Sequence, residues 1–218
     1  MFVGHFAVGF AAKKFAPRSS VAVLLAAPLF ADVLWPFFLL LGWEQVRIDP
    51  GNTRFTPLDF ISYPWSHSLL MLCVWATAFG AVYYAFTRYW PGAIAIWIGV
   101  VSHWVLDWVT HGPDMPLVPG GARYGLGLWN SVTGTLVVEI VMFAVGVWMY
   151  VRVTRAKDRI GRWAFIAYVV LLIAIYIADA FSPPPDNVAE IAWAGVAAAV
   201  ILIPWAWWFD RNRAATSL

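Results

Sequence analysis

Residues 91–111 read PGAIAIWIGVVSHWVLDWVTH. The run is apolar over roughly the 20 residues that a helix needs to cross the hydrocarbon core of a bilayer. Its second half nevertheless holds His103, Asp107 and His111, which lie one turn apart on the same face of a helix. Ionisable side chains at membrane depth are costly and are functional by default. The stretch therefore predicts a membrane-spanning helix that contributes to a polar site.

The composition extends this interpretation to the whole chain. Of the 218 residues, 62% are hydrophobic and only 12% are charged, and 15 are tryptophans of the kind that gather at membrane interfaces. The formal net charge of +2 is too small to indicate binding to nucleic acid, and a single cysteine excludes an intrachain disulfide. We predict an all-α, polytopic transmembrane helix bundle that forms one integral membrane domain, residues 1–218.

Hydropathy predicts about six spans and one shorter apolar segment. Residues 1–15 are too short to span comfortably, and basic residues follow them rather than precede them as in a secretory signal. We expect this segment to be a short or re-entrant helix of the mature fold, packed against the bundle. The six expected spans are residues 20–42, 66–87, 91–111, 130–152, 163–182 and 187–209.

The distribution of basic residues predicts the orientation. With six spans, only Arg47, Arg54 and Arg123 of the 14 lysines and arginines lie on one side, in the loops 43–65 and 112–129. The remainder lie on the other side, which the positive-inside rule assigns to the cytoplasm. The two loops are therefore expected to face outward.

The helical rise of about 1.5 Å per residue estimates how deep each polar side chain lies. His103 and Asp107 fall roughly 12 and 6 Å below His111, which ends its span at the outer interface. The same estimate brings four residues from other segments to the outer half of the membrane: His5, Asp32, His67 and Glu139. We expect these side chains to converge, with the rotation of each helix about its axis left open by the sequence.

The side-chain chemistry favours a divalent metal, with zinc foremost and one or two ions. Imidazole and carboxylate are its usual ligands, and the i, i+4 pair of His103 and Asp107 supplies two from one helix face. A metal also offsets the charge of buried carboxylates and activates water for hydrolysis. The expected ligands are His5, Asp32, His67, His103, Asp107 and His111.

Further roles follow for residues around the expected metal. Asp107 or Glu139 is a candidate general base, and Arg47, Arg54 or Arg123 is a candidate to hold an anionic headgroup. Simpler interpretations stay open. His103 and Asp107 would form only a buried hydrogen-bonded pair, His67 would belong to a helix start capped by Ser66, and His111 would act behind the ligands or on the substrate.

Four short motifs, in order, resemble the membrane-bound metal-dependent hydrolase family of bacteria. They are Gly4-His5-Phe6, the Asp32 segment before Trp35-Pro36, Ser66-His67-Ser68-Leu69-Leu70, and the run from Ser102-His103 to Asp107. The resemblance covers roughly residues 1–115. It implies that His5, Asp32, His67, His103 and Asp107 are metal ligands and active-site carboxylates.

The chain departs from the family pattern at two positions. The P-D-x-D segment reads Ala31-Asp32-Val33-Leu34, so one acidic position is apolar, and Ser66 stands where threonine is common. The missing carboxylate puts a second metal in doubt, unless His111 or Glu139 replaces it. The resemblance implies hydrolysis but leaves the substrate undefined.

These observations together predict a bacterial inner-membrane hydrolase whose site opens toward the extracytoplasmic side. A metal-activated water would cleave an ester or phosphoester, and the expected partner is a membrane lipid or lipid-linked molecule. The alternative is a transporter or ion-binding protein that uses the same cluster. Such proteins often have internal repeats and broken helices, which the sequence does not show beyond its N-terminal segment. Haem ligation by the histidines is a third possibility.

Overall fold

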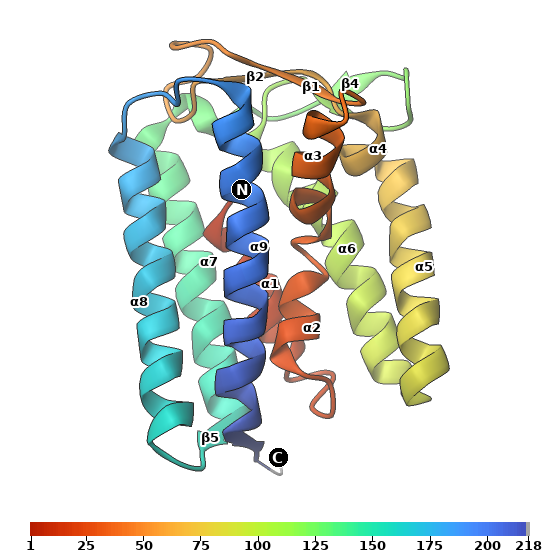
Figure 1. The fold of residues 1–218 in the computed structure, drawn as a ribbon, viewed down its shortest axis with the longest axis vertical. Helices are drawn as coiled ribbons and strands as arrows, with labels where there is room; N and C mark the ends of the chain where they lie inside the picture. The colour runs from red at the N-terminus through yellow and green to blue at the C-terminus, as the bar shows by residue number, and fades with distance from the viewer. Residues whose placement is uncertain (217–218) are drawn as a thin grey trace.

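The computed structural model describes residues 1–216 and shows an all-α bundle whose long helices run side by side (Figure 1). Five helices are long and apolar enough to cross a membrane. They are α5 (Leu69–Thr87), α6 (Trp90–Thr110), α7 (Val132–Val153), α8 (Arg159–Phe181) and α9 (Val188–Arg211). The predicted class, a transmembrane helix bundle, is confirmed.

The prediction of one continuous helix over residues 20–42 is wrong. The segment forms two helices, α2 (Val21–Ala26) and α3 (Phe30–Leu40), which follow one another along the height of the bundle (Figure 1). The break falls at Pro28, which has no N–H group to donate to the helix. The expectation that the chain has no broken helix is therefore also wrong. The α2–α3 pair still carries the chain from one end of the bundle to the other, so the predicted alternation of loops is kept.

The short N-terminal helix forms as predicted. Helix α1 (Val3–Ala12) starts inside the bundle and packs against α2 and α7. Two glycines permit the close approach that packing in a membrane requires. A Cβ atom at Gly9 would lie 2.7 Å from the Cα of Leu25, and one at Gly146 would collide with the backbone of Ala7. The first residues of the chain are thereby held at the depth of the polar site.

Short strands and turns cover one end of the bundle, at the top of Figure 1. Strand β1 (Gln45–Ile48) pairs antiparallel with β2 (Leu58–Ser62), and β3 (Met115–Pro116) pairs with β4 (Arg123–Tyr124). The one-turn helix α4 (Pro64–His67) and the 3-10 turn η1 (Leu128–Asn130) lie at the same end. At the opposite end, β5 (Thr154–Ala156) pairs with β6 (Arg213–Ala215).

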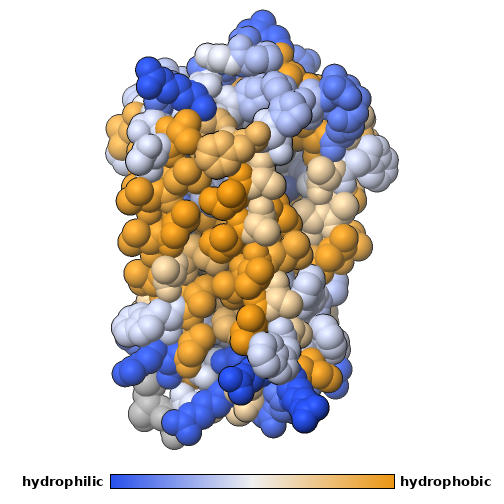
Figure 2. Space-filling model, turned by 90° about the vertical axis from the view of Figure 1, so that its left-hand side faces the viewer, coloured by the Kyte–Doolittle hydropathy of each residue, from blue (hydrophilic) through white to orange (hydrophobic). Residues whose placement is uncertain are grey.

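The surface has the pattern of a membrane protein. Figure 2 shows a face that is apolar through its middle and hydrophilic at both ends. Inside, one core packs α1 and α2 against α7, α8 and α9, and a second packs α3, α5 and α6 beneath the outer strands. Within this apolar interior, the side chains of His5, His103, Asp107 and Glu139 are almost completely buried.

Candidate metal centre

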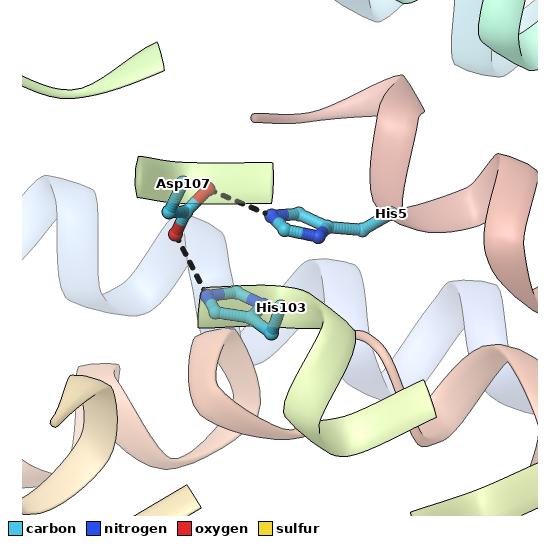
Figure 3. Close-up of side chains that lie close together, drawn as sticks. All are labelled: His5, His103 and Asp107. Atoms are coloured by element: carbon cyan, nitrogen blue, oxygen red, sulfur yellow. Dashed lines mark hydrogen bonds and ion pairs between the residues drawn. The ribbon is translucent and has the colours of Figure 1, made fainter. Parts of the chain in front are cut away.

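The carboxylate of Asp107 lies at the centre of the buried polar residues. Its Oδ2 is 2.9 Å from Nε2 of His103, one turn earlier on α6, and its Oδ1 is 3.1 Å from Nε2 of His5 on α1 (Figure 3). The two imidazole rings stack with their centroids 4.0 Å apart. The nitrogen of Met1 also contacts Oδ1 of Asp107. Two helices that are distant in sequence thus direct imidazole nitrogens at one carboxylate.

Asp32 and His67 complete a second, overlapping group. Oδ1 of Asp32 lies 3.7 Å from Nε2 of His67 and 3.8 Å from Nε2 of His103. Two sets of three potential ligands result, His5 with His103 and Asp107, and Asp32 with His67 and His103. Within each set the ligand atoms lie within 4.8 Å of one another. The structure therefore brings together five of the six residues expected to hold a metal.

Neighbouring groups fix the orientation of two of these histidines. Nδ1 of His103 is 2.7 Å from the carbonyl oxygen of Pro28, at the break between α2 and α3. Nδ1 of His67 is 2.6 Å from Oγ of Ser66, which in turn donates to Oε2 of Glu44 at 2.6 Å. A proton on each Nδ1 leaves the Nε2 lone pair directed at the cluster, the arrangement typical of metal-binding histidines.

The contact between His103 and Asp107 is short, yet its geometry is not that of a hydrogen bond. Nε2 of His103 is buried and finds no hydrogen-bond partner among the described residues. Because Nδ1 donates to Pro28, Nε2 presents a lone pair to a carboxylate oxygen, and two acceptors at this distance need a cation or a shared proton between them. The donor set of imidazole and carboxylate fits a divalent ion.

His111 lies behind the two ligand groups. It follows α6 directly, with Nε2 3.8 Å from Oδ2 of Asp107 and Nδ1 3.0 Å from Oδ1 of Asp114. The Tyr63 hydroxyl donates to the same Asp114 oxygen at 2.8 Å. Burial lowers the pKa of His111, whereas burial and the Asp114 carboxylate raise the pKa of Tyr63 well above its ordinary value. His111 thus borders the cluster without belonging to either ligand group.

Glu139 contacts the start of α1. Its Oε2 accepts hydrogen bonds from the backbone N–H groups of Phe2, at 2.7 Å, and Gly4, at 3.1 Å. Its Oε1 is buried and has no hydrogen-bond partner within residues 1–216. Glu139 is therefore no member of either ligand group, but it positions the helix that carries His5.

The three outer arginines lie away from the cluster. Arg47 is exposed and pairs with Asp59 at 2.6 Å, and Arg54 is also exposed. Arg123 donates to the carbonyl oxygen of Ile61 at 2.8 Å and borders a small cavity of about 180 Å³ between the outer loops. The structure does not bring these side chains to the metal ligands.

An apolar cavity of about 380 Å³ adjoins the cluster. It lies between α3, α8 and α9, and residues of the loop between β1 and β2 close it on the outer side. Asp32 and Glu139 both line it, and 41% of the Asp32 side chain is exposed. Asp32 is thus the ligand candidate through which the cavity reaches the cluster.

Sequence reasoning missed several of the orienting groups. Ser66 does not cap α5, because the cap is Ser68, whose side chain accepts from the N–H of Met71. Ser66 instead joins His67 to Glu44, a residue about 20 positions away with no motif around it. Asp114, three residues after His111, was visible as a possible partner from its spacing alone.

The fold and the site define a class: a polytopic helical membrane protein with a buried histidine–aspartate cluster that could bind a metal. The family model of the YdjM inner membrane protein matches residues 1–182, and the chain belongs to this family. No curated protein and no solved structure matches the chain. The family match extends well beyond the motifs at 1–115. It supports a multi-pass protein of a bacterial inner membrane and gives no reaction.

Proposed function

We propose that the protein is a membrane-embedded, metal-dependent hydrolase that cleaves an ester or phosphoester in a lipid or lipid-linked substrate. The observation that carries this proposal is the buried Nε2 of His103, which faces the Asp107 carboxylate without a hydrogen bond. His5, Asp32 and His67 lie around the same point. Such a donor set suits a divalent ion, of which zinc is the first candidate.

The residues divide into ligands and a base. His5, His103 and Asp107, with Asp32 and His67, would hold one ion, because both ligand groups share the single Nε2 of His103. A divalent ion supplies Lewis acidity to the substrate and a lowered pKa to water. Both oxygens of Asp107 already face nitrogens, so Asp107 is better suited to binding the ion than to accepting a proton.

Glu139 is the favoured proton acceptor. Its Oε2 is occupied by backbone N–H groups, and its Oε1 is free of partners in the described structure. In the proposed reaction a water oxygen bonds to the acyl carbon or phosphorus, and the bond to the leaving oxygen breaks. Glu139 takes the proton from the water and returns it to the leaving oxygen.

The cavity supports a substrate that comes from the bilayer. Its lining is mainly apolar, it lies between membrane-spanning helices, and its lining residues Ile175 and Ala194 are exposed on α8 and α9. Entry of the substrate from the lipid phase between these helices therefore fits the cavity better than entry from water. The distribution of basic residues supports an orientation in which the covered end of the bundle, nearest the cluster, lies outside the cytoplasm.

Elemental analysis and turnover measurements on the purified full-length protein test the proposal. We expect one divalent ion per chain and metal-dependent hydrolysis of ester or phosphoester lipids, with both lost in His103→Ala. Arg47→Gln is the control, because Arg47 is exposed and distant from the cluster. A protein without stoichiometric metal, or a His103→Ala variant with unchanged metal content, refutes the proposal.

A transporter or ion-binding protein is the second candidate, and two features of the fold favour it. The break between α2 and α3 and the half-length α1 are features of transporters that bind ions at mid-membrane. Metal-dependent uptake into proteoliposomes without lipid turnover would select this function. Haem binding is disfavoured, because the stacked rings of His5 and His103, 4.0 Å apart, leave no space for a macrocycle between them.

A further inference from the structure

We propose that the apolar cavity binds an ester with one apolar chain whose polar end carries an ammonium group, and that it discriminates against anionic headgroups. This inference rests on the proposed function and specifies its substrate class. It derives from the charges and unpaired groups along the cavity, which the metal ligands alone do not explain.

The shape and lining of the cavity suit a single chain. On α9 the lining residues extend from Ile191 to Ile203, which corresponds to roughly 18 Å of helix. The deeper residues, among them Phe6, Leu29 and Leu202, are apolar. An apolar chain would therefore occupy the part of the cavity farthest from the outer loops, with the polar end toward them.

The charged side chains along the cavity are all acidic. Three carboxylates line it, those of Asp32, Glu139 and Asp179, and no lysine or arginine is among the described residues that do so. Met1 also lines it, and its N-terminal ammonium pairs with Asp107. A divalent ion and this ammonium would carry three positive charges against the four carboxylates of Asp32, Asp107, Glu139 and Asp179, which leaves one negative charge in excess. Asp179 and Glu139 have no ion-pair partner within residues 1–216. The potential of the cavity therefore favours a cation.

Aromatic and unpaired groups specify the ligand further. Trp35 and Trp129 both line the cavity, and indole rings bind ammonium groups through cation–π interactions. Asp179, exposed near the outer end of α8, is positioned to pair with the ammonium group and leaves Glu139 free to act as the base.

Binding of three probes that contain no ester bond tests this inference separately from turnover. Full-length protein in nanodiscs of an uncharged lipid is titrated with dodecylammonium, dodecanol and dodecanoate, with empty nanodiscs subtracted for partition into the bilayer. We expect dodecylammonium to bind about tenfold more tightly than dodecanoate, from one ion pair and one cation–π contact. Dodecanol is expected to lie between them.

Three variants identify the groups responsible. Asp179→Asn should remove most of the preference for the amine, whereas Asp186→Asn, which removes the same charge from an exposed position outside the cavity lining, should keep it. Ala198→Phe should block all three probes by filling the cavity. Equal binding of amine and carboxylate, or an unchanged preference in Asp179→Asn, overturns the inference.

Metal content and ester hydrolysis are measured on the same preparations. Retained metal and turnover without any preference for the amine would refute the inference and leave the proposed hydrolase intact. Absent metal and turnover with the amine preference retained would refute the hydrolase and leave a cavity that binds ammonium amphiphiles.

Discussion

Replacing Ser66 with alanine tests whether the histidines are held for metal binding. Oγ of Ser66 lies 2.6 Å from both Nδ1 of His67 and Oε2 of Glu44, and the residue is fully buried. Ser66→Ala leaves the His67 N–H without its partner and Glu44 with one hydrogen bond fewer. Losing the group that orients a metal-bound histidine typically lowers metal affinity about 10- to 100-fold, or roughly 1.4 to 2.7 kcal/mol.

Ser68→Ala is the matched control. Ser68 is equally buried and two residues away, but its side chain caps α5 and donates to the carbonyl oxygen of Pro64 rather than contacting His67. Loss of such a cap costs about 1 kcal/mol of stability. Both variants should therefore unfold more easily, and only Ser66→Ala should bind metal more weakly.

Competition between the protein and a chelating dye measures the affinity, and thermal unfolding of the metal-free protein measures the stability. Metal affinity that is unchanged in Ser66→Ala, or lowered equally in Ser68→Ala, would refute the orienting role of Ser66. It would also remove the argument that Nε2 of His67 is held toward the cluster.

Three further predictions concern the centre of the site and the packing around it. Asp107→Asn keeps the side-chain shape but removes the charge that faces both ligand histidines, so elemental analysis should find less than stoichiometric metal. Gly146→Ala should lower the stability of the bundle by about 1 to 3 kcal/mol in thermal unfolding, because the added Cβ meets the backbone of α1. Gly112→Ala is the control and should leave the stability unchanged, because the added Cβ meets nothing within 4 Å. Lys13→Met breaks the buried ion pair between Lys13 Nζ and Asp210 Oδ2, which are 3.0 Å apart. We expect the free energy of unfolding to fall by about 3 to 5 kcal/mol in the same assay. A stability equal to that of the unmodified protein would show that the pair is not formed.

Hydropathy determined the bundle but not the break in its first crossing. The segment 20–42 contains two prolines, and only one of them interrupts the helix. Pro36 is accommodated within α3, whereas the chain bends at Pro28, whose carbonyl oxygen is 2.7 Å from Nδ1 of His103. Local sequence does not distinguish these outcomes, because the partner that stabilises the break is a side chain 75 residues away.

The depth of the site was predictable for a related reason. Helical rise estimates the height of a residue in the membrane, so His5, Asp32, His67 and His103 could be assigned to the outer half of the membrane before their contacts were known. Rotation about the helix axis is set by packing, which depends on close approaches such as that of Gly146 to α1. Contacts that depend on helix rotation or on the path of a loop could therefore not be predicted from the sequence. The contact of Glu44 with Ser66 is the clearest case.

The irregular backbone and the polar site are physically coupled. Within a membrane, each backbone group released from a helix needs a partner in the protein. Here the carbonyl oxygen of Pro28 contacts Nδ1 of His103. The backbone N–H groups of Phe2 and Gly4, at the start of the short helix α1, donate to the carboxylate of Glu139. His103 and Glu139, which contact these backbone groups, also belong to the histidine–aspartate cluster or border it. A continuous helix over α2 and α3 would consume the Pro28 carbonyl group that orients His103, so this break is part of the site's geometry.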